Sequence, residues 1–183
     1  NRTLSLGGGG ITVNSGAGNA VLGVSTNSLS VQLTDTQNWV NNSTSLLNVR
    51  SLRSADSAPG PVVLTLNAAN TGNIAFSLGI SESATKTLGI IVDSASTGSV
   101  TMVASTYTGG TTVKRGILSS SGNVGAGAIS LGVAAGADDA RLNLTGAATN
   151  NITVQTSAGL RTLSGSGSGD FQGDILLNKD VEL

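Results

Sequence analysis

The sequence contains no cysteine and no histidine. Without cysteine the chain forms no disulfide and offers no thiolate as a nucleophile or metal ligand. Without histidine it lacks the side chain that most often acts as a general base near neutral pH and the commonest nitrogen ligand of metal ions. Sites built on a cysteine nucleophile, a histidine base or a zinc ion held by these residues are therefore excluded.

Aromatic and charged side chains are also scarce, at 2% and 10% of the 183 residues. Disordered chains are poor in hydrophobic residues and rich in charge, whereas this chain is 38% hydrophobic with a mean hydropathy of +0.19. The formal net charge is −1 and no cluster of Lys and Arg occurs, which argues against a nucleic-acid partner. No apolar run reaches the length of about 18 residues that predicts a membrane-spanning helix.

Short runs of alternating apolar and polar residues are present instead, for example at 63–66, 74–78 and 88–92. This period of two is typical of β-strands that bury one face. Clusters of Gly, Asn and Ser separate the runs, as at 7–10 and 122–127, and such residues favour tight turns. The pattern predicts an all-β chain that turns every few residues.

Three all-β architectures fit this pattern: a sandwich, a closed barrel and a solenoid. Sandwiches and barrels usually seat several large rings in a wide core, but this chain has only Trp39, Phe76, Tyr107 and Phe171. We therefore predict a right-handed parallel β-helix, or β-solenoid, over the whole of 1–183, with a β-sandwich as the alternative. About 20 residues per turn would give about nine turns and a rod roughly 45 Å long.

Residues 105–118, Ser-Thr-Tyr-Thr-Gly-Gly-Thr-Thr-Val-Lys-Arg-Gly-Ile-Leu, read as strand, turn and strand. The segment resembles the glycine-turn motif of the autotransporter-associated β-strand repeat, found in the secreted passenger regions of large bacterial surface proteins. The likeness is close over 106–113, whereas Lys114 and Arg115 stand where smaller or neutral residues are usual. It implies an extracellular β-solenoid whose structural turn consists of Tyr107, Thr108, Gly109, Gly110 and Thr111. We expect positive φ at both glycines.

A second segment, Gln-Asn-Trp-Val-Asn-Asn-Ser at 37–43, is similar to passenger-type surface proteins of the same kind. Trp39 is expected to cover the edge or bend of one turn of the solenoid. The neighbouring Asn side chains are expected to form hydrogen bonds with the backbone of a corner.

The first and last six residues share a spacing, with Asn first, a cation next and aliphatic residues at the fourth and sixth places. An open solenoid end exposes strand edges that recruit other strands. We therefore predict contacts at both ends, through end-to-end self-association or through covalently attached neighbouring repeats. The residues expected to take part are Leu4, Leu6, Val181 and Leu183.

Carboxylates offer the remaining route to catalysis. The close pairs are Asp138 with Asp139 and Asp170 with Asp174. A glycosidase needs two carboxylates across a sugar cleft, usually with aromatic platforms, and aromatic residues are scarce here. Segment 165–174 partly matches the Gly-x-Gly-x-Asp repeats that bind calcium, but it occurs once, which favours a structural turn. We expect no enzyme activity, no catalytic residue, no cofactor and no metal site.

These features predict a structural protein that forms or contributes to a fibre, an adhesin stalk or a matrix. The resemblance to the autotransporter repeat implies that it is located outside the cell or at a bacterial cell surface. The main alternative is a β-helix that binds or cleaves carbohydrate. A passive spacer that presents another domain is a further alternative. No nucleic-acid partner and no membrane insertion are expected, while the identity of any surface or carbohydrate ligand stays open.

Overall fold

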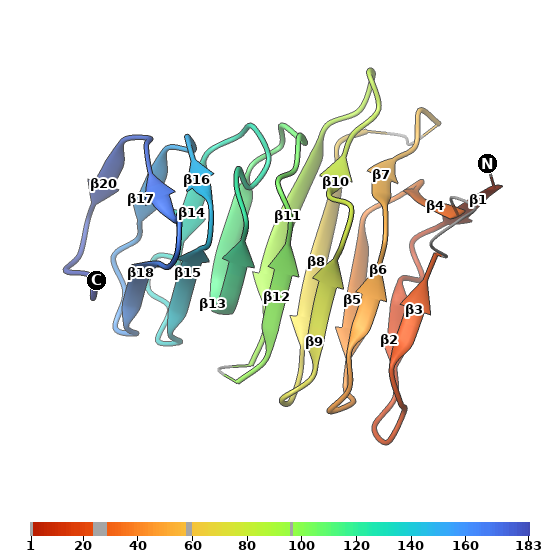
Figure 1. The fold of residues 1–183 in the computed structure, drawn as a ribbon, viewed down its shortest axis with the longest axis horizontal. Helices are drawn as coiled ribbons and strands as arrows, with labels where there is room; N and C mark the ends of the chain where they lie inside the picture. Colours follow the sequence, from red (N-terminus) through yellow and green to blue (C-terminus); the bar gives the residue numbers. More distant parts are fainter. Residues whose placement is uncertain (1, 24–28, 58–59, 96) are drawn as a thin grey trace.

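The computed structural model describes residues 2–23, 29–57, 60–95 and 97–183, and within these ranges it consists of strands and turns. The strands stack in parallel as a β-solenoid of about 7 turns. The chain advances along the long axis, so that β1 and β20 lie at opposite ends (Figure 1). In the described ranges no helix is long and apolar enough to cross a membrane. The prediction of a parallel β-solenoid is confirmed.

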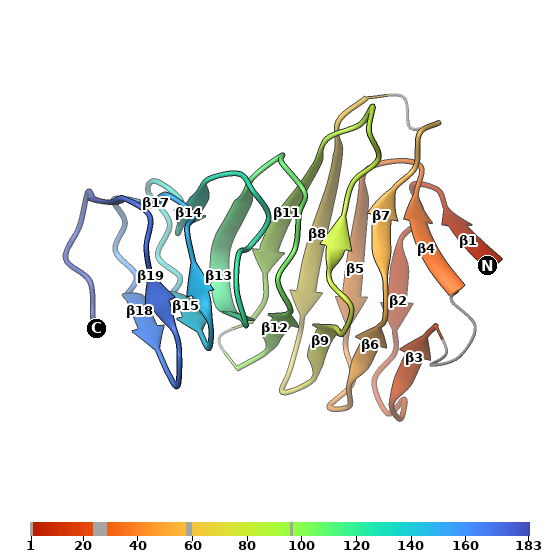
Figure 2. The ribbon, with the colours of Figure 1, turned by 45° about the horizontal axis from the view of Figure 1, so that its top comes forward.

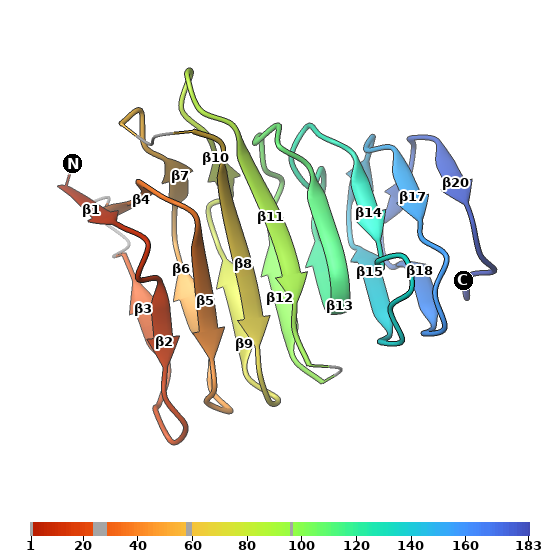
Figure 3. The same ribbon diagram turned by 180° about the vertical axis from the view of Figure 1, so that it is seen from behind.

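Each full turn of the first part contributes one strand to each of three faces. Face A is seen in Figure 2 and contains β1 (Arg2–Leu6), β4 (Leu29–Leu33), β7 (Leu52–Ser54) and β10 (Ile80–Ser81). Face B lies in front in Figure 3 and contains β2 (Ile11–Val13), β5 (Gln37–Asn41), β8 (Val62–Ala68), β11 (Leu88–Asp93), β14 (Ile129–Leu131), β17 (Ile152–Val154) and β20 (Ile175–Leu177).

Face C contains β3 (Ala20–Leu22), β6 (Leu47–Val49), β9 (Asn73–Phe76), β12 (Ser99–Met102), β15 (Ala140–Leu144) and β18 (Arg161–Gly165). One long strand, β13 (Thr111–Ser120), belongs to both face B and face C. Its first half pairs with β11 and β14 of face B, and its second half pairs with β12 and β15 of face C. After β10, face A continues without regular strands until the short pair of β16 (Ala147–Ala148) and β19 (Asp170–Phe171).

The parallel register stacks inward side chains directly on one another. On face B one aligned column runs through every turn, because each member is the register partner of the next. Its members, in order, are Ile11, Trp39, Leu66, Val92, Val113, Leu131, Val154 and Leu177. Six of them, from Trp39 to Val154, have 0% exposed surface. Burying an aliphatic side chain stabilises a fold by about 1.5–3 kcal/mol, so this column is a main source of stability.

Large rings enter this narrow core at a few places. Trp39 and Phe76 are both buried and stack with ring centroids 6.2 Å apart. The Trp39 indole N–H donates to Gln37 Oε1 over 2.8 Å, and Gln37 Nε2 donates to the Leu6 carbonyl of the preceding turn. The expectation that Trp39 covers an edge is wrong: it lies in the middle of β5, where the alternation points it inward.

The predicted turn length is also wrong, because about 7 turns are formed rather than about nine. On face C, Ala20 pairs with Leu47 and Ser99 with Ile117, which correspond to steps of 27 and 18 positions. Most of this difference lies between face C and the next strand of face B, which takes 19 positions from Ala20 to Trp39 but 13 from Val100 to Val113. The corner between faces B and C adds a smaller part. A loop separates β11 from β12 at this corner, whereas β13 passes through it as a continuous strand.

Neighbouring residues of β8 test the inward and outward assignment. Leu66 is fully buried and Thr65 points outward. Leu66→Ala is expected to lower the free energy of unfolding by about 2–5 kcal/mol, because it leaves a cavity in the column. Thr65→Ala should change it by no more than about 0.5 kcal/mol. Guanidinium unfolding followed by circular dichroism measures both, and equal effects would contradict the assignment.

Candidate functional site

The glycine turn lies where the chain enters face B at β13. Tyr107 is fully buried, and its phenol oxygen lies 2.6 Å from Thr111 Oγ1 and 3.9 Å from Met102 Sδ. Burial raises the pKa of Tyr107 above its ordinary value, against the smaller effect of the Thr111 hydrogen bond. Tyr107 therefore stays neutral and acts as a core residue that fixes the turn from inside.

The two glycines of the turn are required for different reasons. Gly110 has φ +79°, a left-handed conformation that favours glycine. Gly109 does not have positive φ, so the expectation of positive φ at both glycines is wrong. A Cβ on Gly109 would lie 2.6 Å from the Leu88 carbonyl oxygen, to which the Gly109 N–H donates over 2.9 Å. Gly109 thus permits a close backbone contact with the preceding turn.

A carboxylate from the preceding turn holds the same segment, and sequence analysis did not identify it. Glu82 Oε2 accepts hydrogen bonds from the backbone N–H groups of Leu88 and Thr108, and Oε1 accepts one from the Thr108 hydroxyl at 2.7 Å. Partial burial raises the pKa of Glu82, but the hydrogen bonds from Thr108 and Leu88 outweigh it and hold the pKa below its ordinary value. Glu82 therefore couples two successive turns.

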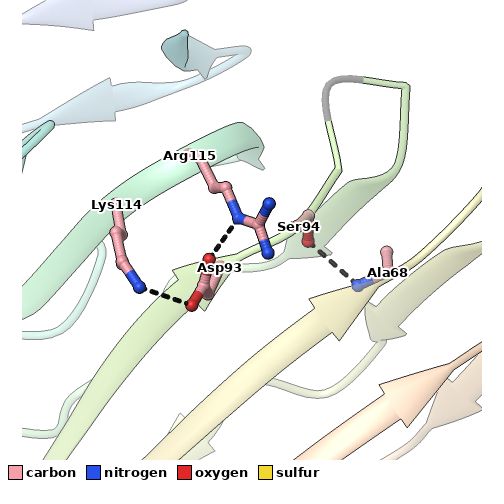
Figure 4. A network of polar contacts seen from close by, with 5 residues as sticks. All are labelled: Ala68, Asp93, Ser94, Lys114 and Arg115. Carbon is pink, nitrogen blue, oxygen red and sulfur yellow. Dashed lines mark hydrogen bonds and ion pairs between the residues drawn. The ribbon is translucent and has the colours of Figure 1, made fainter. Parts of the chain in front are cut away.

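A second charged group lies at the bend of β13 (Figure 4). Between Val92 and Asp93 the register with β11 shifts, so that Asp93 pairs with Arg115. The extra residue of such a bulge places two consecutive side chains opposite one. Lys114 Nζ lies 2.9 Å from Asp93 Oδ2, and Arg115 Nε bonds to Oδ1 of the same carboxylate. The bulge therefore supplies both cations to one acid.

Exposure to solvent limits the free energy that this ion cluster contributes to the stability of the fold. Partial burial raises the pKa of Asp93, but hydrogen bonds from Lys114 and Arg115 and their charges outweigh it, so the pKa lies below its ordinary value. The Lys114 and Arg115 side chains are 46% and 37% exposed, and ion pairs at such positions contribute about 0–1 kcal/mol. The cluster orients the bend more than it stabilises the fold.

Buried polar side chains satisfy the backbone at the corners. Ser94 Oγ accepts from the Ala68 N–H over 3.0 Å, as Figure 4 shows. Asn41 Nδ2 donates to the carbonyls of Ser45 and Asn73, which confirms the expected role of an Asn in this segment. Asn150 Oδ1 accepts from the Val124 N–H. Ser94 and Asn150 were missed, because a single Ser or Asn gives no sequence signal that separates an inner corner from an outer one.

Among the described residues, Arg161 is the one buried residue that carries a formal charge. Its Nη1 donates to the carbonyls of Asp138 and Leu160, and Nη2 bonds to Ser157 Oγ. Burial lowers the pKa of Arg161, against the charges of Asp139 and Asp138. Its guanidinium packs against Gly132, where an added Cβ would lie 2.1 Å from Nε, so no room remains there for a ligand.

The carboxylate pairs considered for catalysis are exposed, with Asp138, Asp139 and Asp174 in turns and Asp170 at the start of β19. Asp138 and Asp139 are exposed, and Asp139 Oδ1 accepts from the Leu160 N–H. Asp170 Oδ2 accepts from Gln172 Nε2, and Asp174 is exposed. Among the described residues, no three Asp or Glu side chains come together as a candidate metal site.

The four residues expected at the ends are placed on different faces. Leu4 and Leu6 are half-buried on β1 of face A. Val181 packs against the core, and Leu183 is 93% exposed. Next to them, Glu182 forms a bridge with Thr162 of β18 on face C. The similar spacing of the first and last six residues therefore does not reflect equivalent positions in a turn.

Comparison of the chain with protein-family models, with curated proteins and with solved structures found no match. The resemblance to the autotransporter repeat therefore rests on the residues of 105–118 and 37–43, and it stays a prediction.

Valine substitutions test the two glycine roles. Gly110→Val forces a β-branched residue into a left-handed conformation, and Gly109→Val pushes a side chain into the Leu88 backbone. Each is expected to reduce stability by about 1–3 kcal/mol. Gly9→Val is the control, because a Cβ there meets no atom within 4 Å. Thermal unfolding compares the three, and a Gly9→Val variant as unstable as the others would contradict this interpretation.

Glu82 makes a pH-dependent contribution to the free energy of unfolding. Because its folded pKa is lowered, that contribution is complete above the unfolded pKa of about 4.3 and is lost as pH falls through the folded value. Glu82→Gln should cost about 1 kcal/mol at pH 7, since water still reaches the carboxylate. The difference from wild type should shrink on acidification below pH ~4. Asp174→Asn is the control, and a Glu82→Gln deficit independent of pH would refute the assignment.

Proposed function

We propose that the chain is a structural segment of an extracellular bacterial surface fibre, adhesin stalk or matrix. The observation that carries the proposal is the aligned column of face B, which runs through every turn from Ile11 to Leu177. Each turn of a solenoid contacts mainly its neighbours, so its length grows with the number of repeats. Such a protein acts through length, stiffness and repetition and requires no reactive site.

The dimensions suit this role. About 7 turns at a strand spacing of about 4.8 Å give a solenoid roughly 34 Å long. Polar cross-links between turns resist bending and shear, since Glu82 joins Thr108 and Asp93 joins both Lys114 and Arg115. These contacts support a stiff rod.

The extracellular location is supported by the resemblance of 105–118 to passenger repeats. The absence of cysteine is compatible with it, because the fold depends on backbone ladders and a packed column instead of disulfides. Both are arguments from the sequence, and the location is part of the proposal.

Further β-structure is proposed to continue the solenoid beyond the last strand. Ile175 and Leu177 of β20 are register partners of Ile152 and Val154, so they occupy core positions, yet they are 39% and 51% exposed. An open strand edge beside exposed core residues favours addition of another strand. A second copy of the chain, joined end to end, or neighbouring repeats of the same polypeptide would cover these residues.

End-to-end association is tested with the 1–183 chain by light scattering and electron microscopy over a range of concentrations. We expect elongated particles that lengthen in steps of roughly 34 Å. Leu177→Lys should reduce association, because it places a charge in the column. Leu78→Lys is the matched control, since Leu78 is 62% exposed and lies in the corner before β10.

A wild-type chain that stays monomeric at high concentration, with both terminal turns ordered, would rule out association between copies and leave covalent repeats as the means of extension. Assemblies that grow in all directions instead of along one axis would overturn the structural proposal itself.

A further inference from the structure

A groove of about 500 Å³ crosses the outer surface of face B near the glycine turn. Its volume falls in the range of about 300–1,000 Å³ typical of small-ligand sites. We propose that this groove binds an uncharged polysaccharide. Its lining residues come from β8, β11, β13, β14 and β17 of face B and from the turns that adjoin these strands.

The floor of the groove is low because small residues meet there. These small residues lie at or just before the start of three successive strands of face B: Gly89 in β11, Gly109 and Gly110 before β13, and Ala128 before β14. A Cβ on Gly89 would lie 3.3 Å from the Gly109 carbonyl oxygen, so the two backbones approach closely. The strands on either side carry larger outward side chains, and the small residues therefore leave a hollow across several turns.

Hydroxyl groups form one wall. Thr112, Ser130 and Thr153 are register partners, so their outward side chains repeat at the strand spacing of about 4.8 Å. Gln155 Nε2 donates to Ser130 Oγ over 3.0 Å and fixes the middle hydroxyl. A regular row of hydroxyls matches a ligand that is itself a repeating chain of polar groups.

The chemistry of the lining selects an uncharged ligand. None of the lining residues is charged, and the nearest cations on β13, Lys114 and Arg115, are paired with Asp93. Hydroxyl and amide groups both donate and accept hydrogen bonds, as sugar hydroxyls require. Val63 and Ile91 add apolar surface for the C–H faces of sugar rings.

An extended peptide fits less well. Peptides that bind β-sheets usually add as a strand at an open edge, through backbone hydrogen bonds. The groove lies on the face of the sheet, where backbone groups already pair in the ladder, as in the Ile90 N–H to Gly110 carbonyl bond of 3.1 Å. Recognition therefore depends on side-chain hydroxyls, which suit a sugar polymer.

The test presents the 1–183 protein to a panel of soluble dextran, xylan, galactomannan and mixed-linkage β-glucan, with alginate as an anionic control and a Gly/Ser/Thr peptide as a peptide control. We expect at least one neutral glycan to bind and to shift the NMR signals of Thr112, Ser130 and Thr153. The double variant Thr112→Ala/Thr153→Ala should bind roughly fivefold to tenfold more weakly, from the loss of hydrogen bonds.

Ala128→Phe fills the groove from an exposed position and should abolish binding. Ala75→Phe is its matched control, because Ala75 points outward on face C, and it should bind as wild type does. Equal melting temperatures show that both variants are folded. Binding of no neutral glycan, binding of alginate or the peptide alone, or unchanged binding by Ala128→Phe would each overturn the proposal. Monomeric protein suffices, so this result is independent of fibre formation.

Discussion

Parallel in-register pairing between successive turns is the constraint on which the rest of this structure depends. Because each strand pairs with the strand one turn away, every inward residue must pack on inward residues above and below it. The face B column meets this condition with side chains from Ile11 to Leu177. It accommodates one large ring, Trp39, because Gln37 satisfies the indole N–H and Phe76 stacks beside it. Each turn of the solenoid encloses only a narrow core, so few aromatic residues are needed to fill it.

The same geometry also requires hydrogen-bond partners for the backbone at each corner, because there the chain leaves the β-ladder of one face before it joins the ladder of the next. Buried N–H and C=O groups need partners. Ser94 and Asn150 supply them inside the corners, and Arg161 does so through Nη1, which donates to two carbonyls. Asn41 combines contacts to its own corner and to the next turn. The polar residues of the interior are therefore part of the scaffold and do not by themselves indicate catalysis.

The bend of β13 connects the fold to its surface features. By passing from face B to face C without a loop, β13 shortens one turn and creates the bulge that brings Lys114 and Arg115 to Asp93. Just before it, the Gly109 and Gly110 turn brings the backbone close to Leu88 and lowers the outer surface. A single irregular turn thus carries the charge cluster, the glycine turn and the groove.

Sequence alone determined the all-β class and favoured the parallel solenoid over a sandwich, because alternation, abundant turn residues and scarce rings are local properties that few architectures accept. It did not determine the number of turns, since corner length does not affect alternation within strands. Nor could it reveal that Gly109 serves a close contact whereas Gly110 serves a left-handed conformation. The partnership of Glu82 with Thr108 and of Asp93 with Arg115 joins residues 26 and 22 positions apart. Only the tertiary register brings such residues together, because it depends on the length of every corner between them.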